Sequence, residues 1–167
     1  MLRSKTKMRH TSFDIKEPGL NILPPGVERY IVNGGGLTGI QILPDDEIEI
    51  INDEGNQVCE ISVFDKDGNS NLQILNLKEK KDTSEIVKIL SKKNESSLTA
   101  NYQLKKRNIK INKSKSAVLF NRDTVPGEKI KLNSKDKCYC IFSAPGPDMI
   151  IHEQNPNTCL LYTSDAA

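Results

Sequence analysis

The sequence is poor in residues that mark several classes of protein. It has no tryptophan, only 5% aromatic residues and two histidines in 167 positions. No apolar run approaches the roughly eighteen residues of a membrane-spanning helix, so we expect no membrane partner. The basic N-terminus is not followed by an apolar stretch, which excludes a secretory signal. The length and the hydrophobic share of 36% predict one globular domain with its own core.

Cysteine is also scarce, and its spacing is irregular. Cys59, Cys138, Cys140 and Cys159 do not follow a disulfide framework, so we expect reduced thiols in the cytoplasm. Cys138 and Cys140 face the same side of a predicted strand and are the candidate metal ligands. Zinc would need a second Cys or His pair at a suitable spacing, which the sequence lacks. The alternative is that both thiols pack as small apolar side chains.

Few side chains are suited to catalysis. His10 lies in the predicted N-terminal arm, which leaves His152 as the candidate for acid–base chemistry. A single loop histidine also commonly serves only as a surface hydrogen-bonding group. No serine or cysteine stands in the strand–turn–helix context of a nucleophile elbow. The sequence alone therefore establishes no catalytic residue.

Charge is distributed unevenly. Residues 78–115 contain 12 Lys or Arg and 4 Asp or Glu, a net charge of +8, while the remainder carries 12 and 18, a net charge of −6. A nucleic-acid surface of this kind would also carry interleaved aromatic residues or arginines, and the segment has only Tyr102 and Arg107. We interpret the segment as a solvated face and expect no nucleic-acid partner.

Residues 48–64 carry the clearest structural pattern. Apolar residues alternate on both sides of a polar tip at residues 52–56, which predicts two strands joined as a hairpin, with Gly55 at positive φ. Asn56 and Gln57 stand at the polar end, and Glu60 lies on the face opposite Cys59 and the apolar residues that follow.

The remaining patterns predict a mainly β protein. We expect about ten short strands and one short helix in a single-domain β-sandwich or barrel. The helix should cover residues 83–93, capped by Asp82 together with Glu85. The predicted strands include 72–77, an edge strand around Ile109 and Ile111, a central strand at 117–120, and strands at 27–32, 129–132 and 138–142.

Two glycine motifs are assigned to turns. Residues 34–39 match a dinucleotide-binding spelling, but a short strand and a Pro-Asp turn follow where a helix is required, so we predict a bend between strands. Residues 65–69 resemble the start of a calcium loop, but Asn76 stands where the bidentate glutamate is needed. A turn is predicted there as well.

The chain divides into three parts. Residues 1–26 are expected to form a flexible arm and a proline-rich lead-in, and residues 27–157 the β-rich domain. Residues 158–167 look different in kind: the run from Cys159 to the end resembles translated sequencing-adapter read-through, as found at the ends of metagenomic reading frames. We therefore expect this tail to be non-native and the natural chain to continue differently after Pro156.

Two stretches carry a resemblance to a known family. Residues 48–64, centred on Gly55, Asn56 and Gln57, resemble the glycine-asparagine-glutamine signature of the urea-carboxylase-associated family, a domain family of unknown function. Residues 125–128 and 136–143, followed by the loop at 154–156, look like the C-terminal section of that family. The resemblance covers roughly residues 27–156.

This resemblance implies two kinds of function. Some members look like deiminases acting on carboxylated guanidine or urea-like molecules. In others, a domain of this kind precedes a folate-dependent aminomethyltransferase resembling the glycine-cleavage T protein. Family members usually carry cysteine and histidine-aspartate motifs in the central section, whereas residues 76–115 have neither Cys nor His. Ala144 also stands where many members have cysteine, which favours the second kind.

The leading prediction is an accessory, small-molecule-binding domain of an aminomethyltransferase-like protein that acts on small methylated amines. It has no cofactor of its own, and tetrahydrofolate is implied for a downstream transferase domain. The alternatives are a stand-alone carboxyguanidine or urea-type deiminase or hydrolase, and a non-catalytic interaction module. A small amine or guanidine-like ligand would contact neutral amides and the Glu60 carboxylate. The alternative is that the amides only form hydrogen bonds with nearby backbone groups. The predicted ligand-binding residues are Asn56, Gln57, Glu60, His152, Glu153, Gln154 and Asn155.

Overall fold

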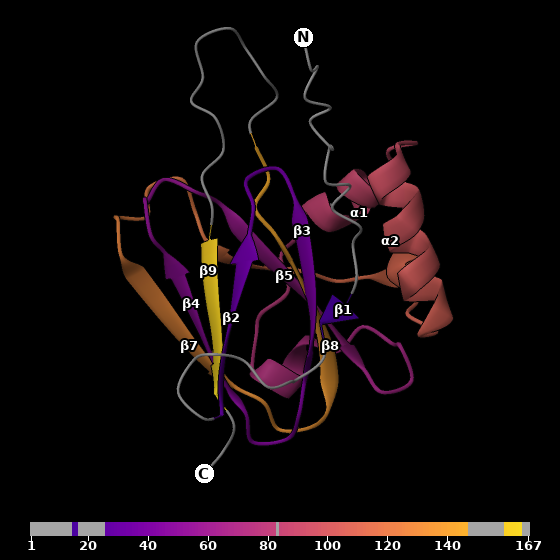
Figure 1. Ribbon diagram of the computed structural model, residues 1–167, viewed down its shortest axis with the longest axis horizontal. Helices are drawn as coiled ribbons and strands as arrows, with labels where there is room; N and C mark the ends of the chain where they lie inside the picture. Colours follow the sequence, from indigo (N-terminus) through magenta and orange to yellow (C-terminus); the bar gives the residue numbers. More distant parts are fainter. Residues whose placement is uncertain (1–14, 17–25, 83, 147–158, 165–167) are drawn as a thin grey trace, which may run out of the picture.

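The computed structural model describes residues 15–16, 26–82, 84–146 and 159–164. Within these ranges two β-sheets stack face to face, and two α-helices lie against one outer face (Figure 1). The mainly β prediction is confirmed, and the architecture is a sandwich because the sheets do not close into a barrel. The described residues hold nine strands, two α-helices and two short 3-10 helices, so the helical content exceeds the prediction.

The two sheets are antiparallel except for one short parallel contact. Sheet A has the order β1-β3-β8-β5-β6, and sheet B has the order β2-β9-β4-β7. Sheet A consists of β1 (Ile15–Lys16), β3 (Leu37–Ile42), β8 (Cys138–Ser143), β5 (Cys59–Asp65) and β6 (Ala117–Phe120). Sheet B consists of β2 (Val27–Val32), β9 (Cys159–Ser164), β4 (Glu47–Asn52) and β7 (Glu128–Asn133).

Sheet A is covered on both faces. Its inner face packs on sheet B through side chains such as Ile61, Val63 and Phe142, which are fully buried. Its outer face packs through Phe64 and Ile141 on helices α1 (Glu85–Leu90) and α2 (Glu95–Lys106). The helices lie together on that side of the sandwich in Figure 1. Among the described residues, no helix is long and apolar enough to cross a bilayer.

The predicted hairpin is wrong. Strands β4 and β5 both form, and Gly55 has the predicted positive φ of 73°, but the strands belong to different sheets. Each strand has a face of buried apolar side chains. When the strands lie in opposite sheets, these two faces pack against each other across the core. The connection between them packs on the loop before β7, where Asn56 N donates to Thr124 O (2.8 Å) and Gly127 N donates to Asn52 O (2.7 Å).

Several other predicted elements are corrected. Residues 72–75 and 111–113 form the 3-10 helices η1 (Leu72–Leu75) and η2 (Ile111–Lys113) instead of strands. Strand β6 is at the edge of sheet A and not at its centre. Ser84, not Asp82, precedes α1, with no side-chain cap, so the predicted capping box is absent. Helix α2, which was not predicted, begins after Asn94, whose Oδ1 accepts from Ser97 N (2.8 Å).

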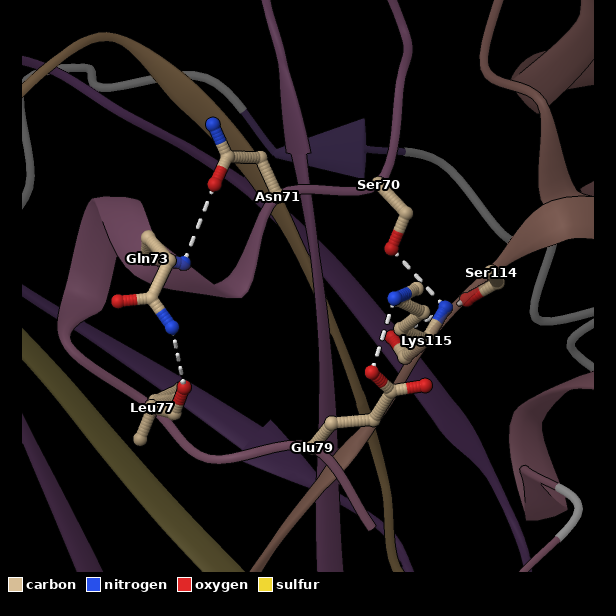
Figure 2. A network of polar contacts seen from close by, with 7 residues as sticks. All are labelled: Ser70, Asn71, Gln73, Leu77, Glu79, Ser114 and Lys115. Carbon is tan, nitrogen blue, oxygen red and sulfur yellow. Dashed lines mark hydrogen bonds and ion pairs between the residues drawn. The ribbon is translucent and has the colours of Figure 1, made fainter. Parts of the chain in front are cut away.

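Local polar contacts explain why residues 70–79 do not continue as a strand. Asn71 Oδ1 accepts from Gln73 N (3.1 Å), and Gln73 Nε2 donates to Leu77 O (3.3 Å), which closes the chain into η1 (Figure 2). Lys115 ties this segment to the approach to β6, because its backbone N–H donates to Ser70 Oγ and its ammonium pairs with Glu79 (Figure 2). Side-chain caps thus replace a ladder of strand hydrogen bonds.

Both ends of the described chain belong to the sheets. Ile15, predicted to lie in the arm, is buried and pairs through β1 with β3. The tail residues Cys159–Ser164 form β9 at the centre of sheet B, paired with β2 and β4 on its two sides. Cys159 and Leu161 face the core, and this period-2 apolar alternation suits a half-buried strand whatever the origin of the segment.

The environment of Gly55 gives a matched pair of substitutions. A Cβ at Gly55 would lie 2.7 Å from Pro126 N, whereas a Cβ at Gly127, at a similar positive φ, would meet nothing within 4 Å. We expect Gly127→Ala to cost about 1 kcal/mol for the left-handed backbone. Gly55→Ala should cost about 3 kcal/mol, since overlap adds to the same strain. Urea unfolding of both variants measures this, and equal losses would show that the connection yields to the methyl group.

Candidate functional site

The buried carboxylate of Glu60 is the centre of the candidate site. Glu60 is 1% exposed and lies on the outer face of β5, beneath α1. An ionised carboxylate in such a place needs a counter-charge and hydrogen-bond donors. The alternation of residues 59–64 correctly places Glu60 on the strand face opposite Cys59. It does not predict that this face is buried.

Lys80 and the first turn of α1 satisfy the carboxylate. Oε1 of Glu60 pairs with the ammonium of Lys80, whose side chain is 15% exposed. Oε2 accepts a hydrogen bond from the backbone N–H of Glu85, the first residue of α1 (3.0 Å). The chain itself therefore places an alkylammonium group against Glu60, at a position that is almost, but not fully, closed to solvent.

Three buried serines lie on the segments that carry or adjoin this ion pair. Ser143 is the cross-strand partner of Glu60 on β8, so the two side chains share a face. Ser84 directly precedes the residue whose N–H bonds Glu60, and the carbonyl of Ser116 accepts from Lys80 N (2.7 Å). Each hydroxyl is buried, and its oxygen has no hydrogen-bond partner among the described residues. Their hydrogen-bonding capacity is available to a small polar molecule.

The predicted amides have a structural task. Gln57 is 3% exposed, and its Nε2 donates to Val58 O (2.7 Å) and Pro145 O (3.0 Å). Asn52 Nδ2 donates to Gln57 O (2.9 Å). Asn56 is exposed and holds a positive φ of 54°. Both amide hydrogens of Gln57 thus serve main-chain carbonyls, as the alternative interpretation of this residue requires.

Gln57 contacts the segment that leads toward the predicted loop at residues 152–155. Pro145, which accepts from Gln57, comes one residue before the last described residue of that segment, Gly146. His152, Glu153, Gln154 and Asn155 lie outside the described residues. The predicted pocket between the amides and this loop therefore stays a prediction.

Cys138 and Cys140 lie side by side in the core, with their Sγ atoms 3.8 Å apart. The hydrogen bond from Cys140 lowers the pKa of Cys138, aided by Ser134 Oγ at 3.6 Å. The same contact and burial raise the pKa of Cys140. No group of three or more His, Cys, Asp or Glu that could hold a metal ion gathers among the described residues. The pair contributes small apolar volume to the sandwich core.

Sequence reasoning missed Lys80, Ser84, Ser116 and Ser143. Their positions relative to Glu60 depend on strand order and on the packing of α1, which local patterns do not encode. The one available signal was Glu60 itself: a carboxylate inside an apolar strand calls for a cation elsewhere in the chain. The lysine-rich segment that follows η1 supplies it.

The ion pair gives a clear prediction for stability. Lys80→Met should lower the free energy of unfolding by about 3 kcal/mol, because it leaves the buried Glu60 charge uncompensated. Lys115→Met is the matched control, since Lys115 and Glu79 are both more than half exposed (Figure 2). That loss should stay below about 1 kcal/mol. Chemical denaturation measures both, and similar losses would mean that Glu60 reaches solvent.

The comparisons with known proteins are sparse. No family model matches the chain. Trimethylamine-oxide aldolase from Ruegeria pomeroyi is 28% identical over 146 residues, which make up 87% of this chain. The chain spans only 18% of the length of that relative. It is therefore similar to a small part of a much longer protein.

Proposed function

We propose that this β-sandwich is an accessory, ligand-binding module of a larger aminomethyltransferase-like protein that acts on small methylated amines. The observation that carries the proposal is the buried Glu60 carboxylate, which holds an alkylammonium group, that of Lys80, against sheet A. The similarity to trimethylamine-oxide aldolase fits the proposed class of ligand, because the name of that protein contains a methylated amine derivative. The transferase reaction rests on the family resemblance alone.

The geometry suits a small cation. Glu60 supplies the negative charge, and the hydroxyls of Ser84 and Ser143 supply neutral hydrogen-bonding groups that have no partner among the residues the structure describes. A methylated ammonium ion could replace the Lys80 ammonium without changing the charge of the site. Because the Lys80 side chain is 15% exposed, its swing toward solvent would open the position.

In this proposal the module binds and positions the amine, and the downstream domain performs the transfer. Tetrahydrofolate chemistry, which the family resemblance implies, belongs to that domain. Asn56, Gln57 and the residues at 152–155 remain candidates for the polar rim. The stand-alone deiminase and the non-catalytic interaction module stay predictions without a specific observation in their favour.

Chemical rescue tests the site. Lys80→Ala removes the ammonium and its stem, so methylammonium or trimethylammonium should occupy the space and raise the melting temperature of the variant in a concentration-dependent way. tert-Butanol, a neutral molecule shaped like trimethylammonium, should not. The double variant Lys80→Ala with Glu60→Gln should lose the response. If the amines stabilise Lys80→Ala no more than the unsubstituted chain, the amine site is not at Glu60.

The natural gene tests the larger assembly. The proposal predicts that the native reading frame, recovered from the source DNA, runs past Pro156 into a transferase domain. Long-read sequencing across this position gives the answer directly. A stop codon within a few dozen codons would refute the modular role, while leaving the rescue experiment to decide on amine binding by the domain itself.

A further inference from the structure

A cavity lies between helix α2 and the segment that runs through η2. Its volume is about 440 Å³, within the usual range for small-molecule sites. The C-terminal half of α2 forms one wall, and the segment that leads into and through η2 forms the other. The lining residues are Asn101, Leu104, Lys105, Ile109, Lys110, Ile111, Asn112 and Lys113. None of them belongs to the Glu60 site.

The floor of this cavity is apolar. Leu104 and Ile109 are 1% and 6% exposed and belong to the core between sheet A and the helices. Ile111 is partly buried against the same cluster. The chain holds this floor in place through Gly68, because Lys110 N donates to Gly68 O (2.9 Å). An apolar ligand body would therefore rest on a surface fixed by the core.

All charged residues of the lining are positive. Lys105, Lys110 and Lys113 are exposed, and the remaining polar members are the two asparagines. Lys110 Nζ donates to a neutral group, Asn69 Oδ1 (2.6 Å), and has no carboxylate partner among the described residues. Within the described part of the chain, Lys105 and Lys113 have neither an ion-pair nor a hydrogen-bond partner for their ammonium groups. Three lysines thus belong to the lining of one hollow, and the described residues of that lining include no carboxylate.

The adjoining end of α2 does not cancel this positive charge. A helix C-terminus is partly negative through its unpaired carbonyls. Here, Arg107 N donates to Gln103 O and Leu104 O, and Asn108 N donates to Lys105 O (3.0 Å). Asn108 adopts a positive φ of 58°, which allows this closure of the helix. The carbonyls of Gln103, Leu104 and Lys105 thus accept backbone hydrogen bonds, which reduces the negative charge that the helix end presents to the lysines.

We propose that this cavity binds a small organic anion: an apolar body rests on Leu104, Ile109 and Ile111, and its carboxylate or phosphate group meets Lys105 and Lys113. The inference is independent of the proposed amine chemistry, since it uses other residues and the opposite ligand charge. It gives a function to part of the basic segment that sequence analysis assigned to a solvated face.

Three probes separate the contributions to binding. 2-Naphthoate carries both an aromatic body and a carboxylate, 2-naphthamide carries the body alone, and inorganic phosphate carries charge alone. We expect calorimetry at low salt to give naphthoate a dissociation constant about tenfold below that of naphthamide. Inorganic phosphate should bind more weakly than naphthoate, and the naphthoate advantage should shrink as salt is raised.

Matched charge removals locate the site. Lys105→Gln with Lys113→Gln should weaken naphthoate binding about fivefold and leave naphthamide unchanged. The control, Lys93→Gln with Lys106→Gln, removes the same charge from exposed positions outside the lining, one of them adjacent to Lys105. Equal effects of the two pairs, equal affinity for naphthoate and naphthamide, or no binding of either would each overturn the proposal.

Discussion

Strand β5 is buried on both faces, and this constraint shapes the rest of the molecule. Its inner side chains complete the sandwich core, while its outer side chains lie beneath the helices. A strand covered on both sides is expected to be apolar throughout. Glu60 is an exception at a fully covered position. Its carboxylate is stabilised by an ion pair with Lys80 and by a hydrogen bond from the backbone amide of Glu85. The candidate site exists because the helical layer closes over a carboxylate.

The same layer serves two opposite kinds of chemistry in our proposals. Where it faces sheet A, it encloses a negative group with spare hydroxyls, suited to a small cation. Beyond α2, it presents lysines around an apolar hollow, suited to an anion. The basic segment 78–115 contributes to both, through Lys80 in the first and Lys105 in the second. This segment, whose net charge is +8, therefore supplies both a buried counter-ion and part of an exposed rim.

Periodicity predicted the strands well, because a half-buried strand needs alternating side chains wherever its partner lies. Val27–Val32 and the apolar faces around Ile61 and Ile130 follow that pattern. Pairing is a different matter: β4 and β5 are neighbours in sequence, yet each finds its partners far along the chain. The alternation of residues 48–64 is equally compatible with a hairpin and with a crossover between sheets.

Helix α2 escaped prediction because its apolar residues do not form one clean stripe. Leu104 is buried, but Leu98 and Tyr102 are more than 60% exposed, and two serines follow Glu95 in the first turn of the helix. Its stability comes from the cap at Asn94 and from packing on α1, which no local pattern reveals. The candidate site was half predicted for a related reason: Glu60 stands out within an apolar strand, whereas nothing marks Lys80 among its neighbouring lysines.

The central place of β9 has a consequence for the order of folding. β2 joins sheet B only through β9, since β9 separates it from β4 by two strand spacings, about 10 Å. During synthesis, β2 emerges early and β9 last of the described strands, so β2 cannot pair within sheet B until residue 164 has been made. Until then, two strand edges stand open to other nascent chains. Completion of this sheet therefore depends on pairing between residues as far apart in sequence as Val27 and Ser164, and it follows the emergence of β9.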